Sequence, residues 1–258
     1  MGINKVSNQE LSTLGANAKL LLHYDGSDGA TTTTDGTGRH STINFVGGAE
    51  LDTSDKKWGT ASLYLNGVPQ SSMNLPDSDD WDLIGSNSDN WNLDFWIKPV
   101  STSGTKFLIG HWTDSSNYWT IRMGDGELDF YAESSGASII STGWSGVIMD
   151  TSWQHILLAK VADKYGLYRN GTQVCYTQDS STATYSGNLY IGRFPVLHIY
   201  VNARYDEIKL CQSNPFGASP NIGKTDTITV PTEAYKYKVN KISTTTLSDI
   251  AKVSGITV

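Results

Sequence analysis

The chain has 258 residues, of which 38% are hydrophobic and only 17% are charged, and its formal net charge is -7. No basic run occurs in this acidic chain, which excludes nucleic-acid binding through phosphate contacts as its function. No apolar run approaches the roughly 18 residues of a membrane span, and the N-terminal stretch shows no apolar signal-peptide segment.

The first predicted element is a short helix over residues 7–15. Ser7 is followed three residues later by Glu10, which is the spacing of a capping box at a helix N-terminus.

From Lys19 to about residue 212 the pattern is that of β-strands. Short stretches of apolar and polar residues in alternation recur between clusters of Gly, Asn, Asp and Ser. This pattern predicts an all-β protein built as an antiparallel β-sandwich or jelly roll. The predicted strands are KLLLHYD, ASLYLNG, NLDFWIKP, KFLIGHW, YWTIRMG, ELDFYAE, HILLAK, YGLYRNGTQVCYT, NLYIGRF and YDEIKL.

The clearest local signal is Asn170-Gly171, between two strand-like arms. Both central residues of a type I′ hairpin turn need positive φ, so this dipeptide predicts a hairpin. With Thr172 it also spells a glycosylation sequon, but the turn explains the dipeptide without a glycan.

The residues after 212 have a different character. A loop-like stretch with two prolines is followed by a weak repeat, in which KVNKIST at 238–244 matches KVSGITV at 252–258. Two copies do not establish an array. We expect an N-terminal segment at 1–18, a β domain at 19–212, and a linker and tail at 213–258 that serves assembly or oligomerisation.

The two cysteines, Cys175 and Cys211, fit no zinc or redox motif. Each falls in a predicted strand, which favours two buried thiols. A disulfide between neighbouring strands is the alternative, and the separation of the two residues decides between them.

Several motifs occur in an order that resembles the laminin-G-like version of the concanavalin A-like jelly roll. The resemblance covers roughly residues 19–212. It implies a fold that hosts lectins, carbohydrate-binding modules, glucanases and lyases, so the fold does not name the function. The chain has a second, weaker resemblance to surface and tail proteins of phages and metagenomic collections. The motifs are LLLHYDG, ASLYLNG, NWNLDFWIKP, SWQHILLAK, GLYRNGTQV, NLYIGRF and ARYDEIKL.

The strand GELDFYAE carries carboxylates on alternate positions, which resembles the E-x-D-x-E motif of laminarin-type glucanases. Glu127 and Asp129 match its first two positions, but the next carboxylate, Glu133, comes too late. Glu127 and Glu133 are about 20 Å apart along a strand, against at most about 9.5 Å for a catalytic pair. We therefore predict a strand with a solvated polar face; only an enzyme would use Glu127 and Asp129 as its catalytic pair.

Carbohydrate binding needs accessible aromatic rings on which sugar C–H groups can stack. Aromatic and basic residues in or beside predicted loops are the candidates for such contacts. They are Trp112, Tyr118, Trp119, Arg122, Trp144 and Arg193.

A structural Ca²⁺ is a further expectation, because the resemblance implies one where the first and last strands meet. The matching oxygen ligands are Asp25, Asn66 and Asp206. The alternative is that Asp25 caps a turn and Asp206 is an ordinary carboxylate at a strand end.

The sequence thus favours a non-enzymatic module that binds a carbohydrate or serves in surface display or structure. It would sit on a virion or an extracellular surface, with a glycan, other surface proteins or further copies of itself as partners. The alternative is a glycoside hydrolase or a polysaccharide lyase of the same superfold. A lyase would need a cluster such as His111, Tyr118 and Arg122.

Overall fold

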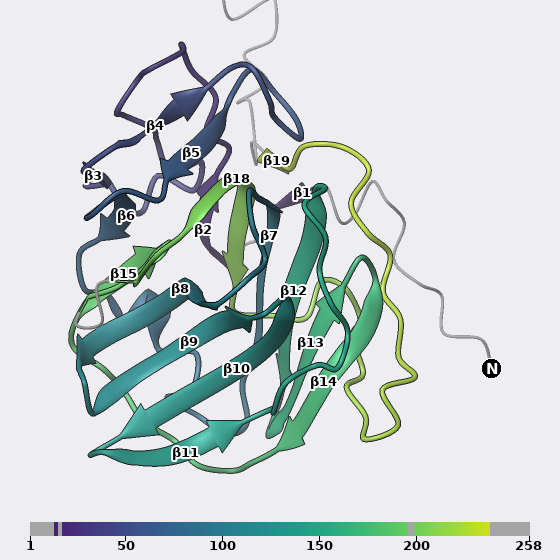
Figure 1. Ribbon diagram of the computed structural model, residues 1–258. Helices are drawn as coiled ribbons and strands as arrows, with labels where there is room; N and C mark the ends of the chain where they lie inside the picture. Colours follow the sequence, from purple (N-terminus) through teal and green to yellow (C-terminus); the bar gives the residue numbers. More distant parts are fainter. Residues whose placement is uncertain (1–12, 15–16, 196–198, 238–258) are drawn as a thin grey trace, which may run out of the picture.

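The protein folds as two antiparallel β-sheets packed face to face (Figure 1). The computed structural model describes residues 13–14, 17–195 and 199–237. The predicted all-β sandwich is therefore confirmed. Within the described part the one helical element is a 3-10 turn, η1 (Asp79–Trp81), and no helix there is long enough to cross a membrane.

The first sheet has seven strands. In spatial order they are β11 (Ala137–Ser141), β10 (Glu127–Ser134), β9 (Asn117–Gly124), β8 (Thr105–Asp114), β15 (Asn188–Ile191), β6 (Ser72–Leu75) and β3 (Asn44–Val46).

The second sheet has eight strands. Seven of them run β14 (Thr172–Gln178), β13 (Lys164–Arg169), β12 (Gln154–Val161), β7 (Asn90–Pro99), β18 (Asn202–Cys211), β5 (Ser62–Asn66) and β4 (Ala49–Asp52), and β2 (Ala18–Leu22) pairs with β18.

Two small pairs lie outside these sheets. The strands β16 (Arg193–Phe194) and β17 (Ile199–Tyr200) pair antiparallel. The strand β1 (Thr13–Leu14) pairs in parallel with β19 (Lys236–Tyr237). Thr13 and Leu14 are the described part of the predicted helix over 7–15, and the helix is wrong there; the rest of it lies outside the described residues.

The main core lies between the two sheets and follows from the alternation of each strand. In β10, Leu128, Phe130 and Ala132 point inward and are fully buried. In β7, Leu93 and Phe95 do the same, which turns Asp94 to the outer side of the sheet. The side chains on the outer faces are therefore not part of the core between the sheets.

The predicted hairpin at Asn170-Gly171 is confirmed, since both residues have positive φ, at 48° and 87°, and they join β13 to β14. The Asn170 side chain is itself part of the turn. Its oxygen accepts from the His155 N–H, and its amide donates to Gln154.

Both cysteines are free and buried. Cys175 packs in the core between the sheets, whereas Cys211 packs with Ala18 and Leu21 in a separate cluster on the outer side. The prediction of two buried thiols is confirmed, and burial raises the pKa of Cys175 to about 12 and that of Cys211 to about 11.

Residues 213–236 run over the outer face of the eight-stranded sheet, beside β13 and β14 (Figure 1). Phe216 and Ile228 pack there on Leu157 and Tyr168. The Tyr168 hydroxyl donates to Asp226 at 2.7 Å. The predicted repeat, at 238–244 and 252–258, lies outside the described residues.

Candidate functional site

The outer face of the seven-stranded sheet carries a group of aromatic side chains that is separate from the main core. Neighbouring strands contribute rings at successive positions, and the ring centroids of Trp112 and Tyr118 are 5.1 Å apart, those of Tyr118 and Tyr131 6.0 Å apart. We call this group the aromatic face. Its members are Phe107 and Trp112 of β8, Tyr118 of β9, Tyr131 of β10, Tyr190 of β15 and Phe194 of β16.

Phe194 ties the β16–β17 pair to this sheet. Its ring stacks on Phe107 with a centroid distance of 3.9 Å and meets Trp112 edge-on at 4.3 Å. Offset and edge-to-face geometries of this kind are favourable for aromatic pairs. The strands β16 and β17 are thereby held against β8, in the middle of the sheet.

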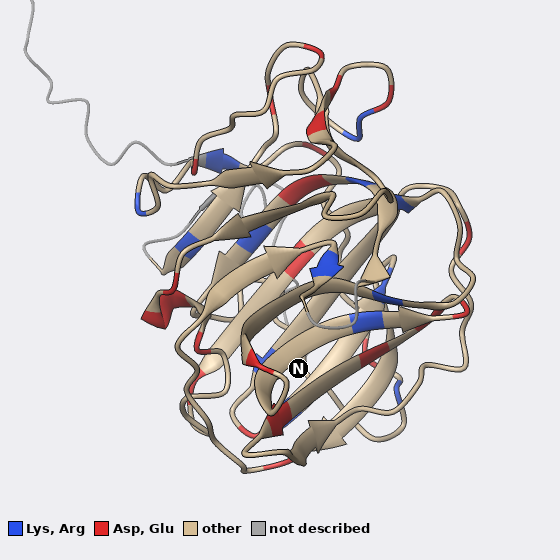
Figure 2. Ribbon diagram, turned by 60° about the vertical axis from the view of Figure 1, so that its left-hand side comes forward, with Lys and Arg blue, Asp and Glu red and all other residues tan. Residues whose placement is uncertain are grey.

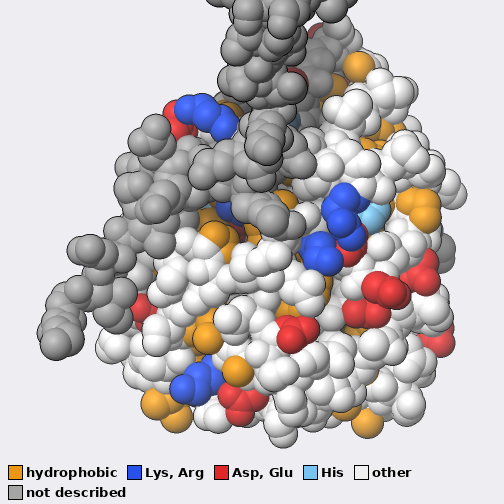
Figure 3. Space-filling model, turned by 180° about the vertical axis from the view of Figure 1, so that it is seen from behind, with side chains coloured by type: hydrophobic (Ala, Val, Ile, Leu, Met, Phe, Trp, Pro, Cys, Tyr) orange, Lys and Arg blue, Asp and Glu red, His pale blue; other side chains and the backbone are white. Residues whose placement is uncertain are grey.

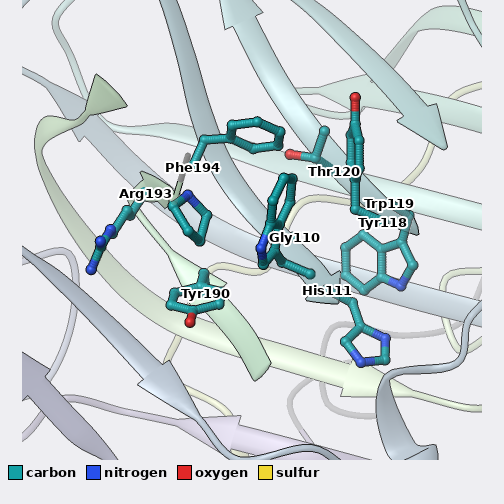
Figure 4. Close-up of a pocket in the computed structure, with 10 residues that line it drawn as sticks. Gly110, His111, Tyr118, Trp119, Thr120, Tyr190, Arg193 and Phe194 are labelled. Carbon is teal, nitrogen blue, oxygen red and sulfur yellow. The ribbon is translucent and has the colours of Figure 1, made fainter. Parts of the chain in front are cut away.

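A small hollow lies between β15 and β16 on one side and β8 and β9 on the other (Figure 4), with a cavity volume of only about 10 Å³. That volume has room for about one water molecule, far below the roughly 300–1,000 Å³ of pockets that engulf small molecules, so the hollow is a shallow surface feature over which a sugar can only lie. Gly110 at its edge permits the close approach of β8 to β9, because a Cβ there would lie 2.6 Å from the Trp119 carbonyl oxygen. Its lining comprises Gly110, His111, Trp112, Tyr118, Trp119, Thr120, Tyr190, Arg193, Phe194 and Pro195.

Next to the hollow, Arg122 is held between two aromatic rings. Its guanidinium carbon lies 4.4 Å from the Tyr131 centroid and 5.0 Å from that of Trp144. The same guanidinium donates to Asp129 through Nε at 2.9 Å and Nη2 at 2.6 Å. Trp144 is 43% exposed, so its ring, resting on Arg122, offers an open surface to a ligand.

Glu127, Asp129, Tyr131 and Glu133 share this face, as the alternation predicts. The prediction that the face is solvated is wrong at Asp129, which is 1% exposed. The reason is its cross-strand partner, since Arg122 stands directly opposite on β9. Thr142 donates to the other oxygen of Asp129 at 2.9 Å.

The remaining carboxylates of β10 are also engaged. Glu133 accepts hydrogen bonds from the Tyr118 hydroxyl at 3.1 Å and the Tyr131 hydroxyl at 3.3 Å. Glu127 accepts from the Gly146 N–H at 3.3 Å. This arrangement fixes aromatic rings in place, which is a positioning role for carboxylates.

The structure brings most of the predicted ligand residues together. Trp112, Tyr118 and Arg193 line the hollow, and Arg122 and Trp144 lie beside it. Trp119 also borders the hollow, but its side chain is fully buried in the main core and its indole N–H donates to the Trp81 carbonyl at 2.8 Å.

Sequence reasoning missed Tyr190 and Phe194 as members of this site. Both belong to the stretch NLYIGRF, whose pairing with β8 is a long-range contact. Tyr131 was placed on the correct face by alternation but was not named as a ligand contact.

The three residues considered for a lyase do not converge. Tyr118 and Arg122 point outward, whereas the His111 imidazole lies on the inner side, edge-on to Tyr185 at 5.8 Å. Its Nε2 is 3.0 Å from the Gly187 carbonyl and 3.3 Å from Asp77. Burial lowers the pKa of His111. Figure 4 shows its ring turned away from Tyr118.

The residues predicted to hold Ca²⁺ do not form one oxygen cage. Asp25 accepts from the Thr60 backbone and hydroxyl, and Asp206 accepts from the N–H groups of Lys57 and Trp58. Asn66 pairs with Asn202, four positions before Asp206 and therefore about 13 Å away along the strand.

The described residues also contain no cluster of three or more metal-ligating side chains. One observation favours a ligand at Asp206, whose Oδ1 is buried without a hydrogen-bond partner. The geometry of the three residues otherwise fits loop anchoring, and calcium binding stays a prediction.

Residues 80–214 match the family model of the concanavalin A-like lectin/glucanases superfamily. The match spans more than half of the 258-residue chain. The protein therefore belongs to this superfamily. The comparison with curated proteins found no match.

Solved structures share the fold at low identity. The binding domain of Paraclostridial Mosquitocidal Protein 1 aligns with a TM-score of 0.60 and 16% identity over 76% of this chain and 49% of that one. The receptor-binding domain of botulinum neurotoxin type G aligns with a TM-score of 0.57 and 13% identity, over 77% of this chain and 48% of that one. The chain thus spans about half the length of these toxin domains.

A third similar structure is almost fully covered. Domain 4 of AbnA, a GH43 extracellular arabinanase from Geobacillus stearothermophilus, in complex with arabinotriose, aligns with a TM-score of 0.57 and 19% identity over 76% of this chain and 93% of that domain. At these identities the likeness shows the fold alone.

Proposed function

We propose that the protein is a non-enzymatic carbohydrate-binding module that binds a glycan on the outer face of its seven-stranded sheet. The observation that carries the proposal is the aromatic face with its hollow, flanked by the exposed Trp144 ring. Phe107, Trp112, Tyr118 and Phe194 are buried and form the base of this face. The rings open to a sugar are the half-buried Tyr131 and Tyr190 and the exposed Trp144, and their contact with sugar C–H groups is dispersive and apolar. The similar arabinanase domain was solved with arabinotriose, which supports a glycan as the ligand class.

A place on a virion or an extracellular surface belongs to the same proposal. It rests on the resemblance of the motifs to those of surface and tail proteins. A glycan-binding module attached to such a protein would bring the whole assembly to its target.

The carboxylates give less support to a hydrolase. A glycosidase pairs one carboxylic acid with one carboxylate across the scissile bond. Of the predicted pair Glu127 and Asp129, Asp129 is ion-paired with Arg122 and Glu127 accepts from the Gly146 N–H at 3.3 Å. Asp129 is therefore not free to serve as acid or nucleophile in the arrangement observed, and Glu127 alone makes no pair.

The proposal predicts retention of the purified chain on at least one polysaccharide in affinity gels. Tyr131→Ala and Trp144→Ala are each expected to weaken binding about 10- to 30-fold, corresponding to roughly 1.4–2 kcal/mol for a stacking anchor. No sugar release is expected from the same polymers.

The matched control is Tyr176→Ala, because Tyr176 is a half-buried tyrosine on β14 of the other sheet. This variant should bind like the unaltered protein. Lack of retention on every polymer, or equal losses in the Tyr176 variant, would contradict binding at the aromatic face.

A further inference from the structure

Arg193 differs from the other arginines of the chain. Arg39, Arg122 and Arg204 are paired with aspartates, and Arg169 donates to the Ile148 carbonyl. Among the described residues Arg193 has neither a carboxylate partner nor a hydrogen-bond acceptor, and its Nε atom is buried without a partner.

The fold places this arginine at the hollow. Arg193 is the first residue of β16, opposite Tyr200, and its guanidinium carbon lies 5.8 Å from the Tyr200 ring centroid. It lines the hollow together with Tyr190 and Trp112, and Figure 4 shows it at the edge of this group.

Because no described residue accepts from the Arg193 guanidinium, a ligand could supply the acceptor. The guanidinium carries five N–H donors in a planar fork, and leaving a buried donor without a partner destabilises the fold. Two parallel N–H groups match the two oxygens of a carboxylate or sulfate. Nε itself is buried, so a bound anion would accept from the other N–H groups of the guanidinium, for which the described part of the chain offers no acceptor.

The surroundings of Arg193 do not compete for it. The lining of the hollow includes no Asp or Glu. The carboxylates on the same sheet face are engaged elsewhere, Asp129 with Arg122 and Glu133 with the tyrosine hydroxyls of Tyr118 and Tyr131.

The overall charge of the chain would not attract a polyanion, because its formal net charge is -7. Over the described residues, charged side chains of both signs are scattered rather than gathered into one basic patch (Figure 2) (Figure 3). Long-range electrostatics therefore repels an acidic polymer, and binding would have to come from a specific contact.

From these observations we infer that the module selects an anionic glycan, with Arg193 binding the carboxylate or sulfate group of a sugar whose ring lies against the half-buried Tyr190. This inference rests on the proposed function and names the ligand class of the same site. Arg193 is then a specificity-determining residue, whereas Tyr131 and Trp144 contribute stacking to any glycan.

The test measures binding of the full chain to polygalacturonate, to its methyl ester, to dextran sulfate and to neutral dextran. The methyl ester has the same backbone without the charge. We expect at least one anionic polymer to bind about tenfold or more tightly than its neutral counterpart, which also tells carboxylate from sulfate. Arg193→Gln should abolish this preference, and Arg193→Lys should keep part of it because the charge remains but the fork does not.

Lys164→Gln is the matched control, since it removes one positive charge from an exposed position on β13. It should leave the preference unchanged. Circular dichroism and thermal unfolding establish that each variant is folded.

The outcomes separate the two proposals. Binding to neutral polymers alone, an unchanged preference in Arg193→Gln, or an equal loss in Lys164→Gln overturns the selection of anions and leaves glycan binding in place. Failure of the folded protein to bind any glycan, charged or neutral, overturns both.

Discussion

A chain that ends at Gln212 is expected to lose its cooperative fold. The segment 213–236 covers the outer face of the eight-stranded sheet, and its removal exposes Leu157 and Tyr168, both fully buried in the whole chain. It also removes the buried rings of Phe216 and Tyr235. Burial of each large apolar side chain contributes about 1.5–3 kcal/mol, and the sum is comparable with the roughly 5–15 kcal/mol that stabilises a whole domain.

Urea unfolding followed by circular dichroism measures this effect. A chain that ends at Tyr237 is the matched comparison, because it keeps every described residue of the segment. The shorter chain should be unfolded, aggregated or at least about 5 kcal/mol less stable than the longer one. Equal stability of the two chains would show that the sandwich is complete without residues 213–237.

Replacing Asp94 by alanine is expected to cost about 3–5 kcal/mol of unfolding free energy. Asp94 is fully buried under the same segment, with Lys209 at 3.4 Å and His155 at 3.3 Å. The Tyr235 hydroxyl also donates to Asp94. Lys209 is 2% exposed, so the alanine variant leaves a buried ammonium without a counter-charge, which is the costly way to break a buried pair.

The double variant Asp94→Ala/Lys209→Met removes both charges and should recover most of the loss in a double-mutant cycle. Glu233→Gln is the control, because the Glu233–Lys236 pair is largely exposed and its loss should cost less than about 1 kcal/mol. A cost below about 1 kcal/mol for Asp94→Ala would mean that water replaces the aspartate.

The strands of the sandwich were predictable because their signals are local. Alternation identifies the inward residues of β7 and β10, and Asn170-Gly171 fixes a hairpin. The Arg122–Asp129 pair could also be predicted from local sequence. Asp125 and Gly126, at φ 48° and 88°, join β9 to β10, and a two-residue turn sets Arg122 opposite Asp129.

The inward direction of the Trp119 side chain could also be predicted from the sequence. Ile121 and Met123 are apolar and lie on one face of β9, and alternation puts Trp119 on that same inward face. Its location beside a predicted loop suggested a ligand contact, but its position in the strand governs its direction.

The hollow itself could not be predicted. It needs β15 beside β8 and the Phe194 ring over Trp112, and both contacts join residues about 80 positions apart. The packing of residues 213–236 on the eight-stranded sheet could not be predicted either. Their composition is loop-like, and the surface on which they pack exists only once the strands are paired.

The most direct test of the central claim is a map of amide chemical shifts while the protein is titrated with a fragment of the polysaccharide that retains it. With the glycan on the aromatic face, we expect the changes to fall on β8, β9, β10, β15 and β16, around Gly110 and Arg193, and to leave β13 and β14 unchanged. Changes confined to the outer face of the eight-stranded sheet would contradict glycan binding at the aromatic face.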